Sequence, residues 1–387
     1  MRISPRVFAV GFGQNLAAFL AWSVIPVWAE FEVHAPAWQL GLLPVFSGIA
    51  YILVALRAGA LSDRIGRGRL ARIGIAGFAA FCVLASFVHS VPMLAMLGTL
   101  NGAALALVWP ALQARIGDSS TAEDLERNLG EFSLSWSAGK TLGFFAFGAV
   151  YGLLGTWALP ACGVLALAMV PLVPAGPEEH HAAVPLVRDD HHSPALRAAH
   201  LRSGWWCNFA AYGMGATLVY MYPALLRSVG RPEAHHGWVL GTVYLAQTVG
   251  FVLFGRFAGW RYRFAPVAGW MAAGAAALLV IGLGSPLAAA VPAAAVLGLA
   301  LGQAYAASVY YSVHSAESRG ARAGIHEAVI GAADFGIPML GGIAVTVTDW
   351  KPSVFVLAAV VVGVSLAMAA RATSRVPSAG SGTPSPG

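Results

Sequence analysis

The chain has 387 residues, of which 58% are hydrophobic and only 10% are charged, and its mean hydropathy is +0.70. A soluble domain carries about 25% charged residues, so the composition excludes an ordinary soluble protein and predicts an all-α membrane protein. The net charge is +6, but all except four of the basic residues lie near the chain ends or in alternate loops. This asymmetry follows the positive-inside rule. We therefore expect a multi-pass protein of the plasma (inner) membrane, with both termini cytoplasmic and no nucleic-acid partner.

Twelve apolar segments come close to the length of about 20 residues that a membrane-spanning helix needs. In chain order they are 7–31, 38–58, 71–89, 91–113, 130–152, 156–173, 203–227, 236–257, 265–284, 287–312, 324–347 and 352–370. We expect an N-terminal six-helix bundle (1–173), a cytoplasmic linker rich in histidine and acids (174–202), a C-terminal six-helix bundle (203–371) and a disordered cytoplasmic tail (372–387). The three cysteines lie within apolar runs and imply no disulfide framework.

The two halves of the chain resemble each other. Asn15-Leu-Ala-Ala-Phe19 in the first segment matches Asn208-Phe-Ala-Ala-Tyr212 in the seventh, at an offset of 193 residues. An offset of 194 residues places Lys140 opposite Asp334. Such matches indicate two parallel repeats of six helices.

Residues 59–69 read Gly-Ala-Leu-Ser-Asp-Arg-Ile-Gly-Arg-Gly-Arg. This loop resembles the signature G-x-L-(S/A)-D-R-x-G-R-(R/K) of the major facilitator superfamily (MFS), whose fold is twelve transmembrane helices in two pseudo-symmetric six-helix bundles. The resemblance implies a conformational latch of Gly59, Asp63, Arg64, Gly66 and Arg67, in which Asp63 meets the N-terminus of segment 324–347 near Gly324 and Gly59 permits the approach. A purely topogenic role for the arginines stays open. The resemblance also pairs segment 130–152 with 236–257, and 324–347 with 38–58.

Segment 130–152 resembles the antiporter motif of this superfamily. Gly130, Gly139, Gly143 and Gly148 fit the motif, whereas Phe144 stands where it has proline. A second motif of proton-linked drug antiporters has arginine at the position of Gly98. We interpret four residues of the two related segments as hinge or packing positions: Gly139, Gly143, Pro338 and Gly341.

Two charges lie near the middle of apolar segments, Lys140 and Asp334. A charge at the centre of a bilayer costs about 2.5–3.5 kcal/mol on insertion scales, so such residues face a cavity or a partner. Asp334 is our candidate for uptake of a coupling proton, and Lys140 for binding an anionic group of a substrate. The alternative is that each residue only holds a polar network between helices, and we do not assume a salt bridge between them.

Seven polar and aromatic residues in the first, fourth, seventh and tenth segments, which line the central cavity in this superfamily, form the predicted substrate cavity: Gln14, Asn15, Asn101, Asn208, Tyr212, Gln303 and Tyr305. Trp136 and Gln247 are further candidates in other segments. The alternative for each residue taken singly is a contact between helices. We assign Trp22, Trp28, Trp38 and Tyr220 to the interfacial aromatic belt instead. Glu131 and Glu327 are expected in the first turns of their helices, where the helix dipole favours an acid. His326 with Glu327 is a second candidate for proton coupling.

We therefore expect a secondary transporter that moves a small organic solute by alternating access, is coupled to protons and exports by antiport. The alternative is proton-coupled or facilitated uptake of a sugar-like or weakly anionic solute. We expect a monomer in the lipid bilayer with no cofactor and no metal site, since no phosphate-binding loop occurs and the acid–histidine blocks of the linker are interpreted as solvated. A membrane enzyme is a different class of protein, and the sequence contains no catalytic constellation for one. A further alternative is a sensor that does not transport and acts through the linker.

Overall fold

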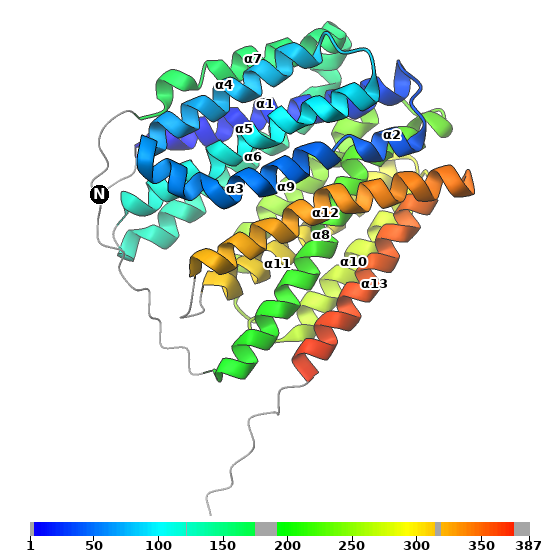
Figure 1. Ribbon diagram of the computed structural model, residues 1–387. Helices are drawn as coiled ribbons and strands as arrows, with labels where there is room; N and C mark the ends of the chain where they lie inside the picture. Colours follow the sequence, from blue (N-terminus) through cyan, green and yellow to red (C-terminus); the bar gives the residue numbers. More distant parts are fainter. Residues whose placement is uncertain (1–3, 121, 175–191, 314–318, 375–387) are drawn as a thin grey trace, which may run out of the picture.

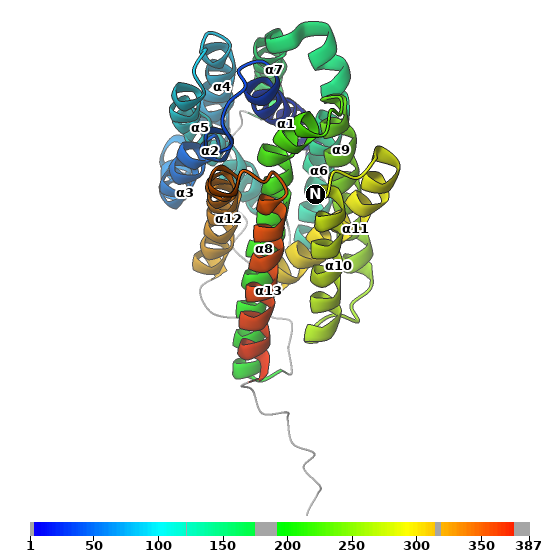
Figure 2. The same ribbon diagram turned by 90° about the vertical axis from the view of Figure 1, so that its right-hand side faces the viewer.

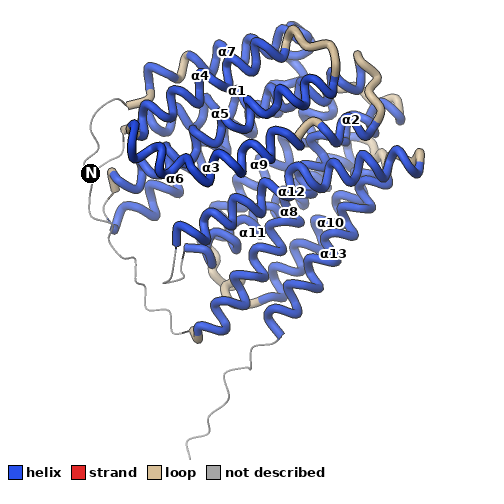
Figure 3. The backbone as a smooth tube through the Cα atoms, viewed as in Figure 1, coloured by secondary structure: helices blue, strands red, loops and turns tan. Residues whose placement is uncertain are grey.

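The computed structural model describes residues 4–120, 122–174, 192–313 and 319–374. Within these ranges the secondary structure is helical throughout, and Figure 3 shows no strand in them. The histidine-rich part of the predicted linker and nearly all of the predicted tail lie outside the described residues.

The first half of the chain forms seven α-helices and the second half forms six in the described residues (Figure 1). The first group is α1 (Pro5–Phe31), α2 (Ala37–Leu42), α3 (Val45–Ile65), α4 (Arg67–Ala85), α5 (Val91–Asp118), α6 (Ala122–Leu154) and α7 (Ala158–Leu167). The second group is α8 (Pro194–Ser228), α9 (Ala234–Arg256), α10 (Phe264–Gly282), α11 (Leu287–Val313), α12 (Arg319–Thr348) and α13 (Ser353–Ser374).

Eleven stretches of the described chain are long and apolar enough to cross a membrane. One of them, Arg127–Leu172, has 46 residues, more than twice what one span needs. It contains α6 from Arg127 onward and all of α7, and the chain turns between them at Gly155, whose φ of 54° suits glycine. The stretch therefore accounts for two spans, and the total agrees with the twelve predicted from the sequence.

Most helix boundaries differ from the predicted ones by a few residues, and three helix starts differ in ways that matter for the site. α8 begins at Pro194, nine residues before the predicted start at 203, because Ser193 caps it through a hydrogen bond from the Leu196 N–H (3.2 Å) and Pro194 suits the first helical position. α6 and α12 begin at Ala122 and Arg319, so the prediction that Glu131 and Glu327 stand in first turns was wrong. Glu327 lies two turns inside its helix.

The helices of each half pack among themselves, and several helix pairs join the halves. Within the halves, α1 packs on α6, α3 and α4 on α5, and α8 on α13, which Figure 2 shows side by side. Between the halves, α2 and α3 pack on α12, α6 on α9, and α1 on α8. These contacts confirm the expected pairing of segment 130–152 with 236–257 and of 324–347 with 38–58.

The contacts between the halves are tight at one end of the molecule. A Cβ added to Gly41 of α2 would lie 2.5 Å from the Pro338 carbonyl oxygen, and one added to Gly342 would lie 2.7 Å from the Ala37 carbonyl oxygen. On the other side, a Cβ at Gly237 of α9 would lie 2.7 Å from the Phe144 carbonyl oxygen. Glycine is what lets these backbones meet.

The halves separate toward the opposite end, where the N-terminal end of α1, the start of α8 and the end of α13 lie (Figure 1). Gly59 of α3, Gly130 of α6 and Gly255 of α9 have no atom within 4 Å of an added Cβ. We call the tight end the closed end and the other the open end.

Candidate functional site

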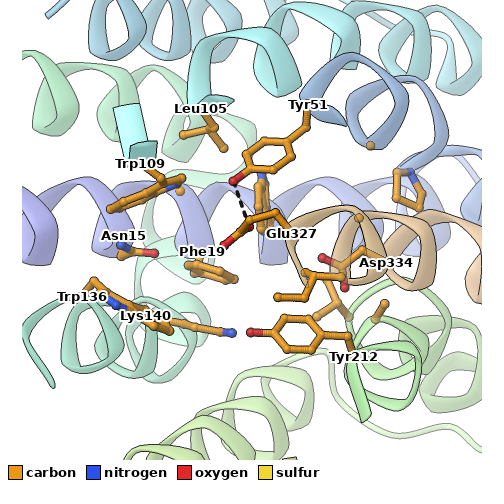
Figure 4. Close-up of a pocket in the computed structure, with 18 of the residues that line it drawn as sticks. Asn15, Phe19, Tyr51, Leu105, Trp109, Trp136, Lys140, Tyr212, Glu327 and Asp334 are labelled. Atoms are coloured by element: carbon orange, nitrogen blue, oxygen red, sulfur yellow. Dashed lines mark hydrogen bonds between the residues drawn. The ribbon is translucent and has the colours of Figure 1, made fainter. Parts of the chain in front are cut away.

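A cavity lies between the two halves, about midway along the helices that join them. It offers about 210 Å³ to water-sized molecules, and both halves supply its walls (Figure 4). From the first half it is lined by Asn15, Ala18, Phe19, Trp22, Pro44, Gly48, Tyr51, Leu105, Trp109, Gln113, Trp136 and Lys140. From the second half it is lined by Tyr212, Ala216, Val219, Tyr220, Tyr244, Tyr305, Glu327, Ile330, Gly331 and Asp334.

Aromatic rings make up much of these walls and meet across the boundary between the halves. The rings of Trp136 on α6 and Tyr305 on α11 lie 6.4 Å apart, edge to face, and Tyr305 also lies 6.2 Å from Tyr212 on α8. Phe19 on α1 lies 6.2 Å from Tyr244 on α9. Large flat surfaces of this kind suit a solute with an aromatic or other planar apolar part.

Lys140 brings a positive charge to one wall. Its side chain is 4% exposed, and its Nζ stands 3.6 Å from the centre of the Tyr244 ring and 4.6 Å from that of Phe19. The rings stabilise the ammonium by cation–π attraction. Since Tyr244 belongs to the other half, this contact also joins α6 to α9. Among the described residues, no carboxylate lies within 4.0 Å of Nζ.

Two carboxylates face the cavity from α12. Glu327 and Asp334 are seven residues apart and therefore share one face of the helix. The Tyr51 hydroxyl of α3 donates a hydrogen bond to Glu327 Oε2 (3.3 Å), which links the halves on the side of the cavity nearer the open end. Figure 4 shows the Lys140 side chain extending toward the hydroxyl end of Tyr212, with Asp334 on the opposite side of the cavity from the Lys140 backbone. The cavity thus holds charges of both signs on opposite halves.

Six predicted residues line this cavity: Asn15, Trp136, Lys140, Tyr212, Tyr305 and Asp334. Four other predicted residues, Gln14, Asn208, Gln247 and Gln303, do not line it, and their side chains are buried among helices at 0–1% exposure. Asn101 also lies outside it. Its amide donates to Ser47 Oγ (2.9 Å) at the edge of a separate, smaller cavity of about 30 Å³. The prediction of a cavity role was therefore wrong for these five amides in this conformation.

Some lining residues escaped the sequence analysis. Trp22 and Tyr220 line the cavity and not a membrane interface, so their assignment to the aromatic belt was wrong. Tyr51 and Trp109 carried no signal, because aromatic residues are common in apolar helices. Glu327 was predicted as an acid at a helix start and, with His326, as a second candidate for proton coupling, but not as a residue of the cavity wall. Its seven-residue spacing from Asp334 was the signal that would have placed it on the same face.

Comparison with known proteins identifies the family of this chain. A family model described as the Major Facilitator Superfamily matches residues 7–206, just over half of the chain. The chain belongs to the Major Facilitator Superfamily.

Two curated relatives share part of this MFS chain. The multidrug efflux pump LfrA of Mycolicibacterium smegmatis is 31% identical over 195 residues, which are 49% of this chain and 35% of that protein. A gallate transporter of Pseudomonas putida is 25% identical over 173 residues, 42% of this chain and 35% of that protein. The chain thus spans about a third of the length of each relative that it matches.

Solved structures share the fold over nearly the whole chain. A bacterial homologue of the human lysosomal transporter Spinster, in an inward-facing and occupied conformation, superposes with a TM-score of 0.74 at 16% identity, over 96% of both chains. The nucleoside transporter NupG (D323A mutant) gives 0.70 at 14% identity, over 95% of this chain and 98% of that one. The fold is therefore that of these solved MFS transporters, and the eleven apolar stretches of the described chain are those of a multi-pass membrane protein.

The signature loop of this MFS chain is intact but makes no latch between the halves. Asp63 is 65% exposed and pairs with Arg67 (2.8 Å), one turn along the chain. Gly59 approaches no other segment, Arg64 is exposed, and Gly66 has a φ of 90° at the turn between α3 and α4. In the part of the chain that the structure describes, Asp63 therefore makes no contact with the start of α12, because the halves stand apart at the open end.

The glycine-rich face of α6 packs on α1. An added Cβ at Gly139 would overlap the Phe12 carbonyl oxygen, and one at Gly143 would lie 2.8 Å from that of Leu16. In α12, an added Cβ at Gly341 would overlap Val354 of α13, while Pro338 faces Gly41 of the other half. All four positions therefore lie at close helix contacts in this conformation.

An ion pair crosses between the halves near the closed end. Arg227 Nη1 at the end of α8 lies 3.2 Å from Glu30 Oε1 at the end of α1. The Glu30 side chain is 7% exposed and that of Arg227 is 42% exposed. A few residues further along the chain, the Tyr151 hydroxyl of α6 donates to Glu32. No cluster of histidine, cysteine and acidic side chains suited to a metal ion occurs in the ranges that the structure describes.

Proposed function

We propose that this MFS transporter is a secondary active carrier that exports a small organic solute in exchange for protons by alternating access. The observation that carries the proposal is the cavity between the halves, tight at one end and charged on both walls. In MFS folds the two halves rock about a site near the bilayer midplane. A cavity lined equally by both halves is suited to be that site.

Positive-inside asymmetry supports the orientation. The open end carries the basic loop at 64–69, which the rule assigns to the cytoplasm. The conformation described here is then inward-facing, with both termini in the cytoplasm and the chain in the plasma (inner) membrane. A monomer suffices, since one chain supplies both halves of the cavity.

Asp334 is the proposed site of the coupling proton. Its carboxylate faces the cavity without an ion-pair partner within 4.0 Å among the described residues. A proton neutralises a carboxylate at membrane depth, and so does a solute cation or the approach of Lys140. If a proton and a solute cation compete for the one Asp334 carboxylate, binding of one releases the other, which is the simplest way to exchange solute for protons. Glu327 with His326, whose Nδ1 lies 2.8 Å from Ser308 Oγ, is the second candidate.

Two observations bear on the direction of transport. The partial glycine motif of α6 and the similarity to the efflux pump favour export. The alternative is proton-coupled or facilitated uptake of a sugar-like or weakly anionic solute. The positive charge of Lys140 in the cavity and the similarity to the gallate transporter favour this alternative.

The signature loop and the four packing positions are proposed to serve the opposite state. When the open end closes, Asp63 would reach the positive N-terminal end of α12 and hold α3 against it. Gly59 would permit that approach, and Arg64 and Arg67 would pair with acids or lipid phosphates. The helix contacts at Gly139, Gly143, Pro338 and Gly341 would then turn or slide as the halves move.

Proteoliposomes test coupling and direction together. Protein is reconstituted with an internal pH dye, and a panel of aromatic amines, acids and amino acids is added under an imposed proton gradient. We expect wild-type protein to carry protons against a solute of the panel, and Asp334→Asn to carry none. Collapse of the inward proton gradient should stop export if the exchange is antiport. Proton movement of wild-type rate in Asp334→Asn would move the coupling site to Glu327 and His326.

A further inference from the structure

The two central charges of the cavity stand on opposite halves of the molecule. Lys140 belongs to α6 of the first half and Asp334 to α12 of the second, and both line the same cavity. Among the described residues, neither has an ion-pair partner within 4.0 Å. The third charge, Glu327, differs because it accepts the hydrogen bond of Tyr51.

A solute with one charge would compensate only one of these two groups. A cation would pair with Asp334 and leave Lys140 on its rings, and an anion would pair with Lys140 and leave Asp334 alone. An unpaired charge becomes costly once the cavity closes and water leaves. A solute with an ammonium and a carboxylate would compensate both walls.

The walls of the cavity that holds these charges are largely aromatic. Trp136 and Tyr305 meet at 6.4 Å across the halves, and Phe19 and Tyr244 meet at 6.2 Å beside Lys140. Ring faces of this kind stack on a planar apolar body. The apolar part of such a solute would therefore be an aromatic ring, and the ring would carry the two charged groups.

We propose that the substrate is an aromatic zwitterion, with its carboxylate on Lys140 of the first half and its ammonium on Asp334 of the second. The inference rests on the proposed transport function and names the substrate class of the same cavity. Such a solute bridges the halves, so its binding stabilises a closed cavity more than an open one. On binding, the ammonium takes the place of the Asp334 proton, which leaves to solvent, so exchange with protons is preserved.

Calorimetric titration of the purified full-length protein tests this with two matched series at pH 7. The first series is 4-(aminomethyl)benzoate, 4-methylbenzylamine and 4-methylbenzoate, whose zwitterion has its charges at opposite ends of a ring. The second is tryptophan, tryptamine and indole-3-propionate, whose zwitterion has its charges close together. We expect the zwitterion of at least one series to bind about tenfold more tightly than both of its singly charged relatives.

Two variants assign the charges, and a third is the control. Lys140→Met should remove the preference of the zwitterion over the amine, and Asp334→Asn should remove its preference over the acid. Asp349→Asn is the matched control. Asp349 is an exposed acid outside the cavity with a φ of 50°, which asparagine tolerates, so this variant should bind as wild type does. The comparison of ligands on wild-type protein stands even if a variant fails to fold.

The outcomes separate this inference from the transport proposal. If an amine or an acid alone binds as tightly as the zwitterion in both series, or if none of the six binds, the zwitterion inference is overturned. Proton release in the same titrations, followed in weak buffer, reports on coupling. A zwitterion preference without proton release would uphold the substrate class and contradict the proposed coupling. If an amine binds as tightly as the zwitterion and also releases a proton, the proposed coupling would stand and the zwitterion inference would be contradicted.

Discussion

Arg67 is the most connected residue of the signature loop. Its guanidinium lies 2.7 Å from Asp118 at the end of α5 and 2.8 Å from Asp63, and it donates to Ser62 Oγ (3.0 Å). At 13% exposure of its side chain, these bonds are partly shielded from water. The residue thus ties the turn between α3 and α4 to α5 within the first half, whatever it does between the halves.

We expect Arg67→Ala to lower the free energy of unfolding by about 1–3 kcal/mol, because it leaves two carboxylates without their partner. The measurement is the Tm of the purified protein in detergent. Arg64→Ala is the matched control, since Arg64 is exposed in the same loop, and it should change stability by less than about 0.5 kcal/mol. Equal losses in the two variants would show that Arg67 is no more than a topogenic charge.

Gly139 permits the closest approach of α6 to α1. A methyl group there would overlap the Phe12 carbonyl oxygen, so Gly139→Ala must push the helices apart. We expect a loss of about 1–3 kcal/mol from overpacking, read as a lower Tm. Gly130→Ala on the same helix meets open space and should be neutral or stabilising by up to about 1 kcal/mol. A Gly139→Ala variant as stable as wild type would refute this packing role.

Gln14 and Asn15 show what sequence could and could not predict at this scale. Both are amides of α1, but only Asn15 lines the cavity, while Gln14 is fully buried. Successive residues of a helix point about 100° apart, and an almost wholly apolar helix gives no hydrophobic face from which to read its rotation. Lys140 and Asp334 were found because a charge inside an apolar segment needs a cavity whatever the rotation.

At the scale of elements, the closed end depends on helix pairs from opposite halves. α1 meets α8 at the Glu30–Arg227 ion pair, and α2 meets α12 at glycine contacts. The pairing of α2 with α12 was predicted from the family resemblance, whereas no pairing of α1 with α8 was predicted. The ion pair was not, because Glu30 and Arg227 lie 197 residues apart and nothing in either segment indicates the other.

The Glu30–Arg227 ion pair should stabilise the conformation in which the closed end is shut. Arg227→Leu leaves the buried Glu30 unpaired, at a cost of about 1–3 kcal/mol, between that of exposed and fully buried pairs. We expect a cysteine at Ala37, which is 5% exposed beside α12, to react faster with an impermeant maleimide in that background. The native cysteines are buried and should react little.

A double variant that exchanges the charges of residues 30 and 227 is the control. Glu30→Arg with Arg227→Glu should restore slow labelling, whereas either change alone should not. Unchanged labelling in Arg227→Leu would mean that glycine packing alone closes this end, and the ion pair would then be incidental to gating.

At the scale of the whole molecule, length, hydropathy and the loop at 59–69 were enough to predict the MFS fold and the twelve spans. They could not specify the conformation. The contact predicted for Asp63 belongs to a state in which the open end is shut, and the structure holds the other state. A sequence encodes both arrangements of a carrier, so a contact inferred from it need not exist in any one structure.

The central claim is that the halves rock about the cavity under control of Asp334, and spin-label distances in nanodiscs test it most directly. One pair of labels takes Gly130→Cys and Gly255→Cys at the open end, where added side chains meet no atom. The other takes Val33→Cys and Val229→Cys, exposed positions beside the Glu30–Arg227 pair.

We expect a change from pH 8.5 to pH 5.5 to shift the two distances in opposite directions. One pair should shorten as the other lengthens, and Asp334→Asn should abolish the dependence on pH. Distances that stay fixed at both ends, or that lengthen together, would contradict alternating access about this cavity. A reciprocal shift that persists unchanged in Asp334→Asn would leave the rocking motion standing and remove Asp334 from its control.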